Sequence, residues 1–197
     1  GLGGSFLFDG KLARGNSYQA GQVGHIPVVT NGILCACGQK GCLNTIASGW
    51  SILADLGLSI PPASSPLRLV NDGLLLENVI SRAKNGDKVV ELAAFRAGHA
   101  LGKMLSGLYQ ALAPEVILTV GPIAEINSYI NGIISAASEN NIKLPLFTPK
   151  DQKFKSVASS AALHGLSEFL FSPNFRLTDL MPNISNRARS DLRETVL

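Results

Sequence analysis

Hydrophobic side chains recur at two spacings along the chain, one typical of helices and one typical of strands. Between residues 88 and 112 they return every three or four positions, which predicts a long helix with one buried face. Asp87 precedes this stretch as a favourable N-cap, and Pro114 ends it. Small residues in the stretch should let a second helix pack closely against it: Ala97, Gly98 and Gly102.

Shorter helices are predicted where the same spacing returns. They cover residues 43–57, 74–84, 123–139 and 156–171. In the third of these helices, the side chains expected to point inward are Ile126, Ile130, Ile133, Ile134 and Ala137. Prolines and serines predict a loop or a short crossover over residues 59–72.

The patterns that predict strands cover fewer residues than those that predict helices. Asp9-Gly10 lies between two apolar runs and predicts a hairpin over residues 6–13, because both residues accept the positive φ of a tight turn. Residues 26–29 and 144–148 are predicted as short strands, and the run VILTV at 116–120 as a strand buried on both faces. Alternating strands and helices with a helical C-terminal half indicate an α/β domain.

Composition narrows the class of protein. The chain has 197 residues, 46% hydrophobic and 16% charged, as in a globular domain. A net charge of +3 is too small to predict nucleic-acid binding within this chain. No apolar run reaches the roughly 18 residues of a membrane helix. The odd number of cysteines, three, argues against a disulfide framework and predicts a reducing, cytoplasmic location.

All three cysteines and one histidine fall within residues 25–42, with the spacing H-x9-C-x-C-x4-C. Three thiolates and one imidazole make a closed tetrahedral set, which predicts a structural zinc ion. The predicted ligands are His25, Cys35, Cys37 and Cys42. The glycines expected at the tight turns between them are Gly32, Gly38 and Gly41. Two alternatives stay open: iron, or a metal-free group of small buried cysteines beside a hydrogen-bonded histidine.

Residues 24–49, GHIPVVTNGILCACGQKGCLNTIASG, resemble the zinc signature of the ROK family of repressors, open reading frames and sugar kinases. The stretches 6–25, 116–122 and 159–170 resemble further parts of that family. The resemblance implies the C-terminal lobe of an actin- or hexokinase-like (ribonuclease H-like) fold over residues 1–173, with a polar extension over 174–197. Because the chain opens in mid-motif, the N-terminal lobe and any DNA-binding domain are expected outside it.

The resemblance also implies sugar-binding residues. One ring nitrogen of His25 would bind zinc while the other reaches a sugar hydroxyl. Gln22 and Asn44 stand where the family has two sugar-binding glutamates. An amide still hydrogen-bonds but loses the charge-assisted bond to a hydroxyl. One hypothesis is therefore a phosphorylated or acidic sugar, and the other is a site that no longer binds.

On the nucleotide side the resemblance is incomplete. Gly1, Gly3 and Gly4 match the end of a family phosphate loop, and a plain tight turn is the equal alternative. Gly121-Pro122 replaces a double glycine near the adenosine, and proline has no N–H to offer. The family's catalytic aspartate would lie upstream of Gly1, so no residue of this chain is assigned to catalysis.

Two functions follow from the resemblance. The first is the effector-binding lobe of a transcriptional regulator that binds a sugar or sugar phosphate, dimerises, and contacts DNA through an upstream domain. The second is the C-terminal half of a sugar kinase, which would use ATP and Mg²⁺. The altered glutamates and glycines favour the regulator, because a regulator need not transfer a phosphoryl group. A degenerate lobe that only mediates association is the third possibility.

Three further residues draw attention but are predicted to be structural. Trp50 is expected in the core, and His99 and His164 are expected to be packing or surface residues within helices.

Overall fold

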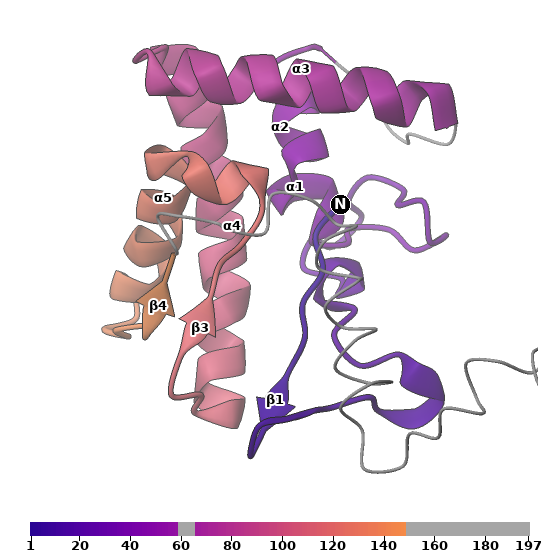
Figure 1. The fold of residues 1–197 in the computed structure, drawn as a ribbon, viewed down its shortest axis with the longest axis vertical. Coiled ribbons are helices and arrows are strands. Elements are labelled where there is room, and N and C mark those ends of the chain that lie inside the picture. Colours follow the sequence, from indigo (N-terminus) through magenta and orange to yellow (C-terminus); the bar gives the residue numbers. More distant parts are fainter. Residues whose placement is uncertain (59–65, 149–197) are drawn as a thin grey trace, which may run out of the picture. The chain divides into compact units, whose positions relative to one another are not determined.

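Helices α4 and α5 lie side by side in Figure 1 and form the largest helix–helix contact of the fold. The computed structural model describes residues 1–58 and 66–148. Helix α4 spans Lys88–Leu112, as the sequence predicts, and α5 spans Asn127–Ser138. The Asp87 side chain accepts hydrogen bonds from the backbone N–H groups of Val89 and Val90, which confirms the predicted N-cap.

Glycines allow the backbones of α4 and α5 to touch. A Cβ at Gly98 would lie 1.9 Å from the carbonyl oxygen of Tyr129, and one at Gly132 would lie 2.2 Å from that of Phe95. At Gly102 the corresponding distance to the carbonyl oxygen of Ile133 is 2.5 Å. No side chain fits at these separations, so the prediction of close helix packing at Gly98 and Gly102 is confirmed.

Three more helices complete the core: α1 (Asn44–Ala47), α2 (Gly49–Asp55) and α3 (Pro66–Lys84). The largest fully buried side chains come from several of these elements and include Leu43, Ile52, Leu53, Val79, Val90, Ile126, Tyr129 and Ile133. The Tyr129 hydroxyl donates a 2.8 Å hydrogen bond to the carbonyl of Ala47, and burial raises the pKa of this phenol. This bond ties α5 to α1.

Two helix predictions are corrected. Residues 43–57 do not form one helix, because Ser48 adopts an extended conformation (φ −87°, ψ 166°) between α1 and α2. Its Oγ accepts a 3.2 Å hydrogen bond from the N–H of Ser51 and so caps α2. Residues 66–72 are helical rather than a loop: α3 already begins at Pro66, a position at which a helix does not need the missing N–H. Residues 59–65 lie outside the described part.

The N-terminal hairpin forms as predicted. Strand β1 (Leu7–Phe8) pairs antiparallel with β2 (Lys11–Leu12), and Asp9 and Gly10 make the turn with φ of 50° and 73°. Two short 3₁₀ helices follow, η1 (Asn16–Tyr18) and η2 (Val23–His25). The strand predicted over residues 26–29 is wrong. Pro27 makes one isolated bridge, to Cys42, and the next two N–H groups both bond to the carbonyl of Gly41.

The second strand pair is parallel and short. Strand β3 (Ile117–Leu118) aligns with β4 (Leu146–Phe147), with Ile117 opposite Leu146. The prediction that residues 116–120 are buried on both faces is wrong, because the outward side chains of Val116, Leu118 and Val120 are 58%, 56% and 63% exposed. Among the described residues β3 pairs with β4 alone, which leaves those side chains uncovered.

The helix predicted over residues 123–139 begins later. Residues Pro122–Glu125 form a 3₁₀ helix, η3, ahead of α5. Ile126, Ile133 and Ala137 are buried as predicted, but Ile134 is 49% exposed, and Tyr129 and Ala136 are buried instead. The helical period places Ile134 one residue beyond the face that meets α4.

The prediction of a helix over residues 156–171 and of a polar extension over 174–197 falls outside the described residues, as does His164. In the part of the chain that the structure describes, no helix combines the length and the apolar character that crossing a membrane requires.

Candidate metal centre and ligand site

The metal loop, residues 25–42, folds back on itself through close backbone contacts. Gly41 has φ 72°, and a Cβ there would lie 1.8 Å from the carbonyl oxygen of Val29. A Cβ at Gly32 would lie 2.6 Å from the Cα of Gly41. Gly38 has φ 89° but open space around it. At Gly32 and Gly41 a neighbouring backbone atom leaves no room for a side chain, so glycine is required there. At Gly38 only the positive φ favours glycine.

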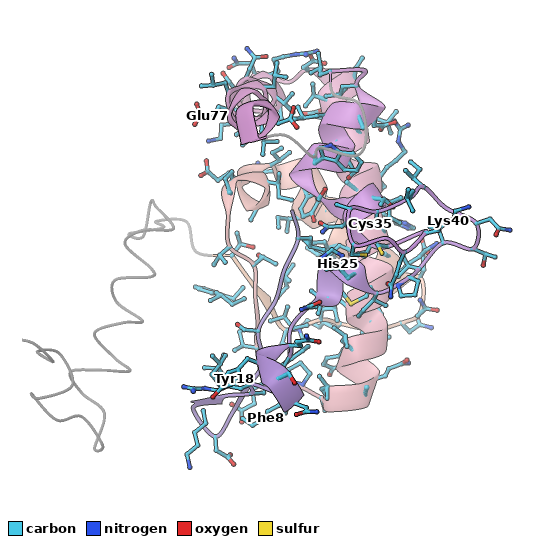
Figure 2. All side chains as sticks on the ribbon, turned by 90° about the vertical axis from the view of Figure 1, so that its right-hand side faces the viewer. Phe8, Tyr18, His25, Cys35, Lys40 and Glu77 are labelled. Carbon is cyan, nitrogen blue, oxygen red and sulfur yellow. The ribbon has the colours of Figure 1, made fainter. Side chains whose placement is uncertain are left out.

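These turns bring the four predicted ligands together. One nitrogen of His25 and the Sγ atoms of Cys35, Cys37 and Cys42 all lie within 4.8 Å of one another. The Cys35 Sγ to His25 Nδ1 distance is 3.6 Å, and so is the distance between the Sγ atoms of Cys37 and Cys42. Figure 2 shows His25 and Cys35 next to the yellow sulfur atoms, with Lys40 at the outer end of the loop.

Two of the separations between the ligand atoms are those expected around a zinc ion. Bonds of about 2.0–2.3 Å at tetrahedral angles place neighbouring ligand atoms roughly 3.3–3.8 Å apart, and both 3.6 Å separations fall in that range. Soft thiolates with one imidazole are the donor set of a closed structural site. The alternative of three buried cysteines is contradicted in one respect, because Cys37 is exposed.

Burial and charge differ among the thiols. Cys42 is fully buried, and burial raises the pKa of its thiol to about 12. The pKa of Cys37 is lowered, chiefly by a hydrogen bond from the backbone of Gln39. A buried thiolate at Cys42 therefore needs a neighbouring positive charge, which a metal ion bound by the four ligands would supply.

The orientation of His25 gives its two ring nitrogens different surroundings. Nδ1 faces the cysteines, 3.6 Å from the Sγ of Cys35. Nε2 is on the other edge of the imidazole and is not the nitrogen that faces that thiol. His25 ends η2, and its backbone N–H donates a 3.0 Å hydrogen bond to the carbonyl of Gln22. The side chain of Gln22 is exposed, and the contacts given for the described residues do not join it to the cluster.

Asn44 begins α1, two residues after Cys42, and its side chain is partly buried. Its Oδ1 accepts a 2.6 Å hydrogen bond from the backbone N–H of Leu2. This contact, between residues 42 apart in the sequence, could not be read from any local pattern. The first residues of the chain thus lie directly against the start of α1.

The glycines assigned to phosphate binding lie in two places. A Cβ at Gly1 would be 3.7 Å from the Asn44 side chain, and the N–H of Gly4 donates a 2.9 Å hydrogen bond to the carbonyl of Gly21. Gly3 has open space around it. Gly121, with φ 104°, follows β3 at the start of η3. Gly1 is thus packed against Asn44, and Gly4 against Gly21.

A cavity of about 340 Å³ opens between the metal loop and helices α1, α2 and α3. Its walls are Gly1, Leu34, Cys35, Ala36, Asn44, Thr45, Ser48, Trp50, Leu53, Asp72, Gly73 and Leu76. Trp50 is half-buried rather than a core residue, and its indole N–H is buried with no hydrogen-bond partner among the described residues. The sequence pattern gave no indication of Asp72, because α3 is predicted to begin after it.

His99 plays the packing role predicted for it. Its Nε2 lies 2.6 Å from Glu139 Oε1, and its ring stacks on Phe95 at 6.1 Å between centroids. The neighbouring imidazole lowers the pKa of the Glu139 carboxyl. This pair lies on α4 and after the end of α5, away from the residues that line the cavity.

Comparison with known proteins identifies the relatives of this fold. The sequence profile of the ROK family matches residues 1–168. An N-acetylmannosamine kinase of Yersinia pestis (strain Pestoides F) is 29% identical over 137 residues, which are 69% of this chain and 43% of that protein. The chain therefore spans less than half of the length of the curated relatives it matches.

Two solved structures share the fold. A ROK family glucokinase from Streptomyces griseus, in complex with glucose and AMPPNP, superposes with a TM-score of 0.60 at 24% identity, covering 75% of this chain and 52% of that one. A ROK family transcriptional regulator, a homologue of the E. coli MLC protein, gives 0.56 at 24% identity, covering 75% and 38%. The fold is thus shared by a kinase and a regulator.

Proposed function

The chain belongs to the ROK family, and we propose that it is the sugar-binding C-terminal lobe of a ROK transcriptional regulator. The lobe would comprise residues 1–173 of the actin- or hexokinase-like fold, followed by an extension over 174–197. It would bind a sugar or sugar phosphate and dimerise, and DNA would be contacted by a domain outside residues 1–197. A cytoplasmic location is part of this proposal.

The orientation of His25 is the observation that carries the proposal. Its Nδ1 already faces Cys35 at 3.6 Å, so a zinc ion held by His25, Cys35, Cys37 and Cys42 would fix the ring. Zinc supplies a positive charge and a rigid anchor in such a site. With Nδ1 as a ligand, the proton sits on Nε2, and His25 can donate a hydrogen bond to a sugar oxygen.

The neighbouring residues suit recognition better than phosphoryl transfer. Gln22 and Asn44 are amides and cannot act as general bases at neutral pH. Gly121 is followed by Pro122, which has no N–H for a phosphate. None of the residues assigned here to sugar or zinc binding is a catalytic base, so we assign no catalytic residue to this chain.

A ROK sugar kinase is the second candidate. It is favoured by one observation: the matching curated relatives include N-acetylmannosamine kinases. In that case Gly1, Gly3, Gly4 and Gly121 would contribute to the binding of ATP and Mg²⁺. The general base would come from outside residues 1–197.

Zinc analysis and calorimetry test the proposal together. We expect one zinc per chain and binding of a sugar that is lost in His25→Ala, which removes one ligand and the hydrogen-bond donor. His164→Ala is the matched control, because it removes a histidine that is not assigned to the site. Retention of sugar affinity in His25→Ala contradicts the proposal. Sugar-dependent ATP turnover by a longer protein that supplies the general base from outside residues 1–197 would favour the kinase.

A further inference from the structure

We propose that Cys37 is an oxidation site for hydrogen peroxide, and that its oxidation joins it to Cys42 in a disulfide and releases the metal. This inference rests on the proposed function in one respect, namely that His25 and the three cysteines hold zinc. It goes further by making the metal set reversible, because oxidation would free the His25 ring that the proposed function uses to bind a sugar.

The three thiols of the metal loop differ in their access to solvent. Cys37 is exposed, whereas Cys35 and Cys42 are 7% and 0% exposed. A dissolved peroxide must touch the sulfur that it oxidises, and reactivity follows exposure. Cys37 is therefore the thiol of this loop that peroxide reaches first, and Cys42 is reached only through it.

Cys42 is placed to react with an oxidised Cys37. The two Sγ atoms lie 3.6 Å apart, which is roughly 1.5 Å more than the length of a disulfide bond. While both sulfurs bind a metal ion, the ion holds them at this separation. Once the Cys37 sulfur is oxidised and no longer a ligand, rotation about its side-chain bonds can close the remaining gap.

The backbone allows Cys37 to make this movement while Cys42 stays in place. Cys37 lies inside a turn that the N–H of Gly38 closes by donating a 2.9 Å hydrogen bond to the carbonyl of Cys35, and Gly38 has open space around it. The carbonyl of Cys42 accepts two hydrogen bonds from Thr45, of 2.8 Å from the backbone N–H and 2.7 Å from the hydroxyl. The exposed thiol is thus on the movable side of the pair.

The reaction needs hydrogen peroxide and two protons from solvent. Thiols that bind a metal are deprotonated, and the Cys37 thiolate attacks one peroxide oxygen: an S–O bond forms, the O–O bond breaks, and hydroxide leaves as water after taking a proton. The Cys42 thiolate then attacks the Sγ of Cys37: an S–S bond forms, the S–O bond breaks, and a second water leaves in the same way. The two sulfurs together give up the two electrons that reduce the peroxide.

The disulfide would dismantle the metal set. Two of its four ligands are consumed, and His25 and Cys35 alone do not make the four-coordinate site that a structural zinc ion requires. The His25 ring would lose the anchor that fixes its orientation. Oxidation of one exposed thiol would therefore reach the proposed sugar site through a ligand that the two share.

Peroxide treatment of the zinc-loaded chain tests the inference. We expect one zinc ion to be released for each disulfide formed, as measured with a chromogenic chelator. A dithiol reductant added with fresh zinc should restore the bound metal, because a disulfide is reducible and higher oxidation states of sulfur are not. Hydrogen exchange of residues 25–42 should rise on oxidation and fall again after reduction.

Peptide mapping identifies the two cysteines that are joined. Trypsin, which cuts after lysine and arginine, gives the peptides 15–40 and 41–68, with Cys37 in the first and Cys42 in the second. The expected disulfide links these two peptides, and fragment ions distinguish Cys37 from Cys35 as the residue that carries the link. A disulfide between Cys35 and Cys37 would stay inside the first peptide.

A variant without the exposed thiol sharpens the test. Cys37→His keeps four ligands, because two cysteines and two histidines also form a structural zinc site, and we expect it to retain zinc. In peroxide it should release the metal at least about tenfold more slowly than the unaltered chain. Ala36→Ser is the matched control, since it changes the adjacent residue and no ligand, and it should release zinc at the unaltered rate.

The outcomes separate this inference from the proposed function. Zinc that stays bound in peroxide, zinc released without a link between Cys37 and Cys42, or equally fast release from Cys37→His overturns the inference and leaves the proposed function standing. An unaltered chain that takes up no zinc overturns both. The peptide map of the unaltered chain decides the question even where Cys37→His fails to fold.

Discussion

The metal loop and the β3–β4 pair are both irregular regions with few ladder hydrogen bonds, yet they are fixed in different ways. The metal loop gathers four ligand atoms within 4.8 Å, and its glycines allow backbone atoms to touch. Strand β3 is held by hydrogen bonds such as those from Ile117 N–H to Pro145 and from Thr119 N–H to Phe147, while its outward side chains stay exposed. A short segment is well specified when side-chain chemistry and steric contact act on it together.

Removing a ligand should have the largest effect. Cys42→Ala deletes the fully buried thiol of the predicted zinc set, and we expect loss of stoichiometric zinc and of ordered structure in the metal loop. Zinc content and hydrogen exchange of residues 25–42 measure this, with the exchange of residues 116–120 expected to stay the same. Ala36→Ser is the control, since it lies between two ligands and changes none. A Cys42→Ala protein that keeps one zinc per chain contradicts the assignment.

The glycines of the loop allow a paired test of steric contact against conformation. Gly41→Ala places a Cβ 1.8 Å from the Val29 carbonyl oxygen in addition to the strain of a positive φ, and should cost at least about 3 kcal/mol of unfolding free energy. Gly38→Ala has the positive φ alone and should cost about 1 kcal/mol. Urea unfolding of the zinc-loaded protein gives both values. Equal costs would show that contact with Val29 does not constrain the loop.

The bond between Tyr129 and Ala47 joins the helix pair to α1, which follows the metal loop. Tyr129→Phe leaves the buried carbonyl of Ala47 without this donor and should cost about 1–2 kcal/mol of unfolding free energy. Tyr18→Phe, at a side chain that is 77% exposed, is the control and should cost little. A similar small cost for both variants would mean that water replaces Tyr129 at the Ala47 carbonyl.

Features that depend on residues close together in the sequence could be predicted, and features that depend on residues far apart in the sequence could not. Helix α4, its Asp87 cap and the four clustered ligand residues depend on neighbours in the sequence, so their spacing was enough to predict them. Whether the ligands hold zinc stays a prediction. The role of Asn44 depends on Leu2, 42 residues away, and no local pattern records such a contact.

The same limit explains the two errors with the largest structural consequence. Next to the break at Ser48, Gly49 packs against α3 and η3, which are distant in the sequence: a Cβ there would meet Leu76 at 2.8 Å and Ile123 at 3.1 Å. The run at 116–120 has the composition of a buried strand, but burial is decided by what covers it. The composition of this run therefore predicted a strand but not whether its side chains are buried.

The smallest change in unfolding free energy is expected at residue 120, and it tests whether the region of β3 is exposed. Val120→Thr changes a side chain that is 63% exposed and should alter the unfolding free energy by less than about 0.5 kcal/mol. Val90→Thr makes the same change at a fully buried position of α4 and should cost about 1–3 kcal/mol, because the hydroxyl loses its hydration there. Urea unfolding of the two variants under one set of conditions gives the difference directly. If Val120→Thr costs as much as Val90→Thr, residue 120 is covered in solution, and the contrast between a constrained metal loop and an exposed β3 no longer holds.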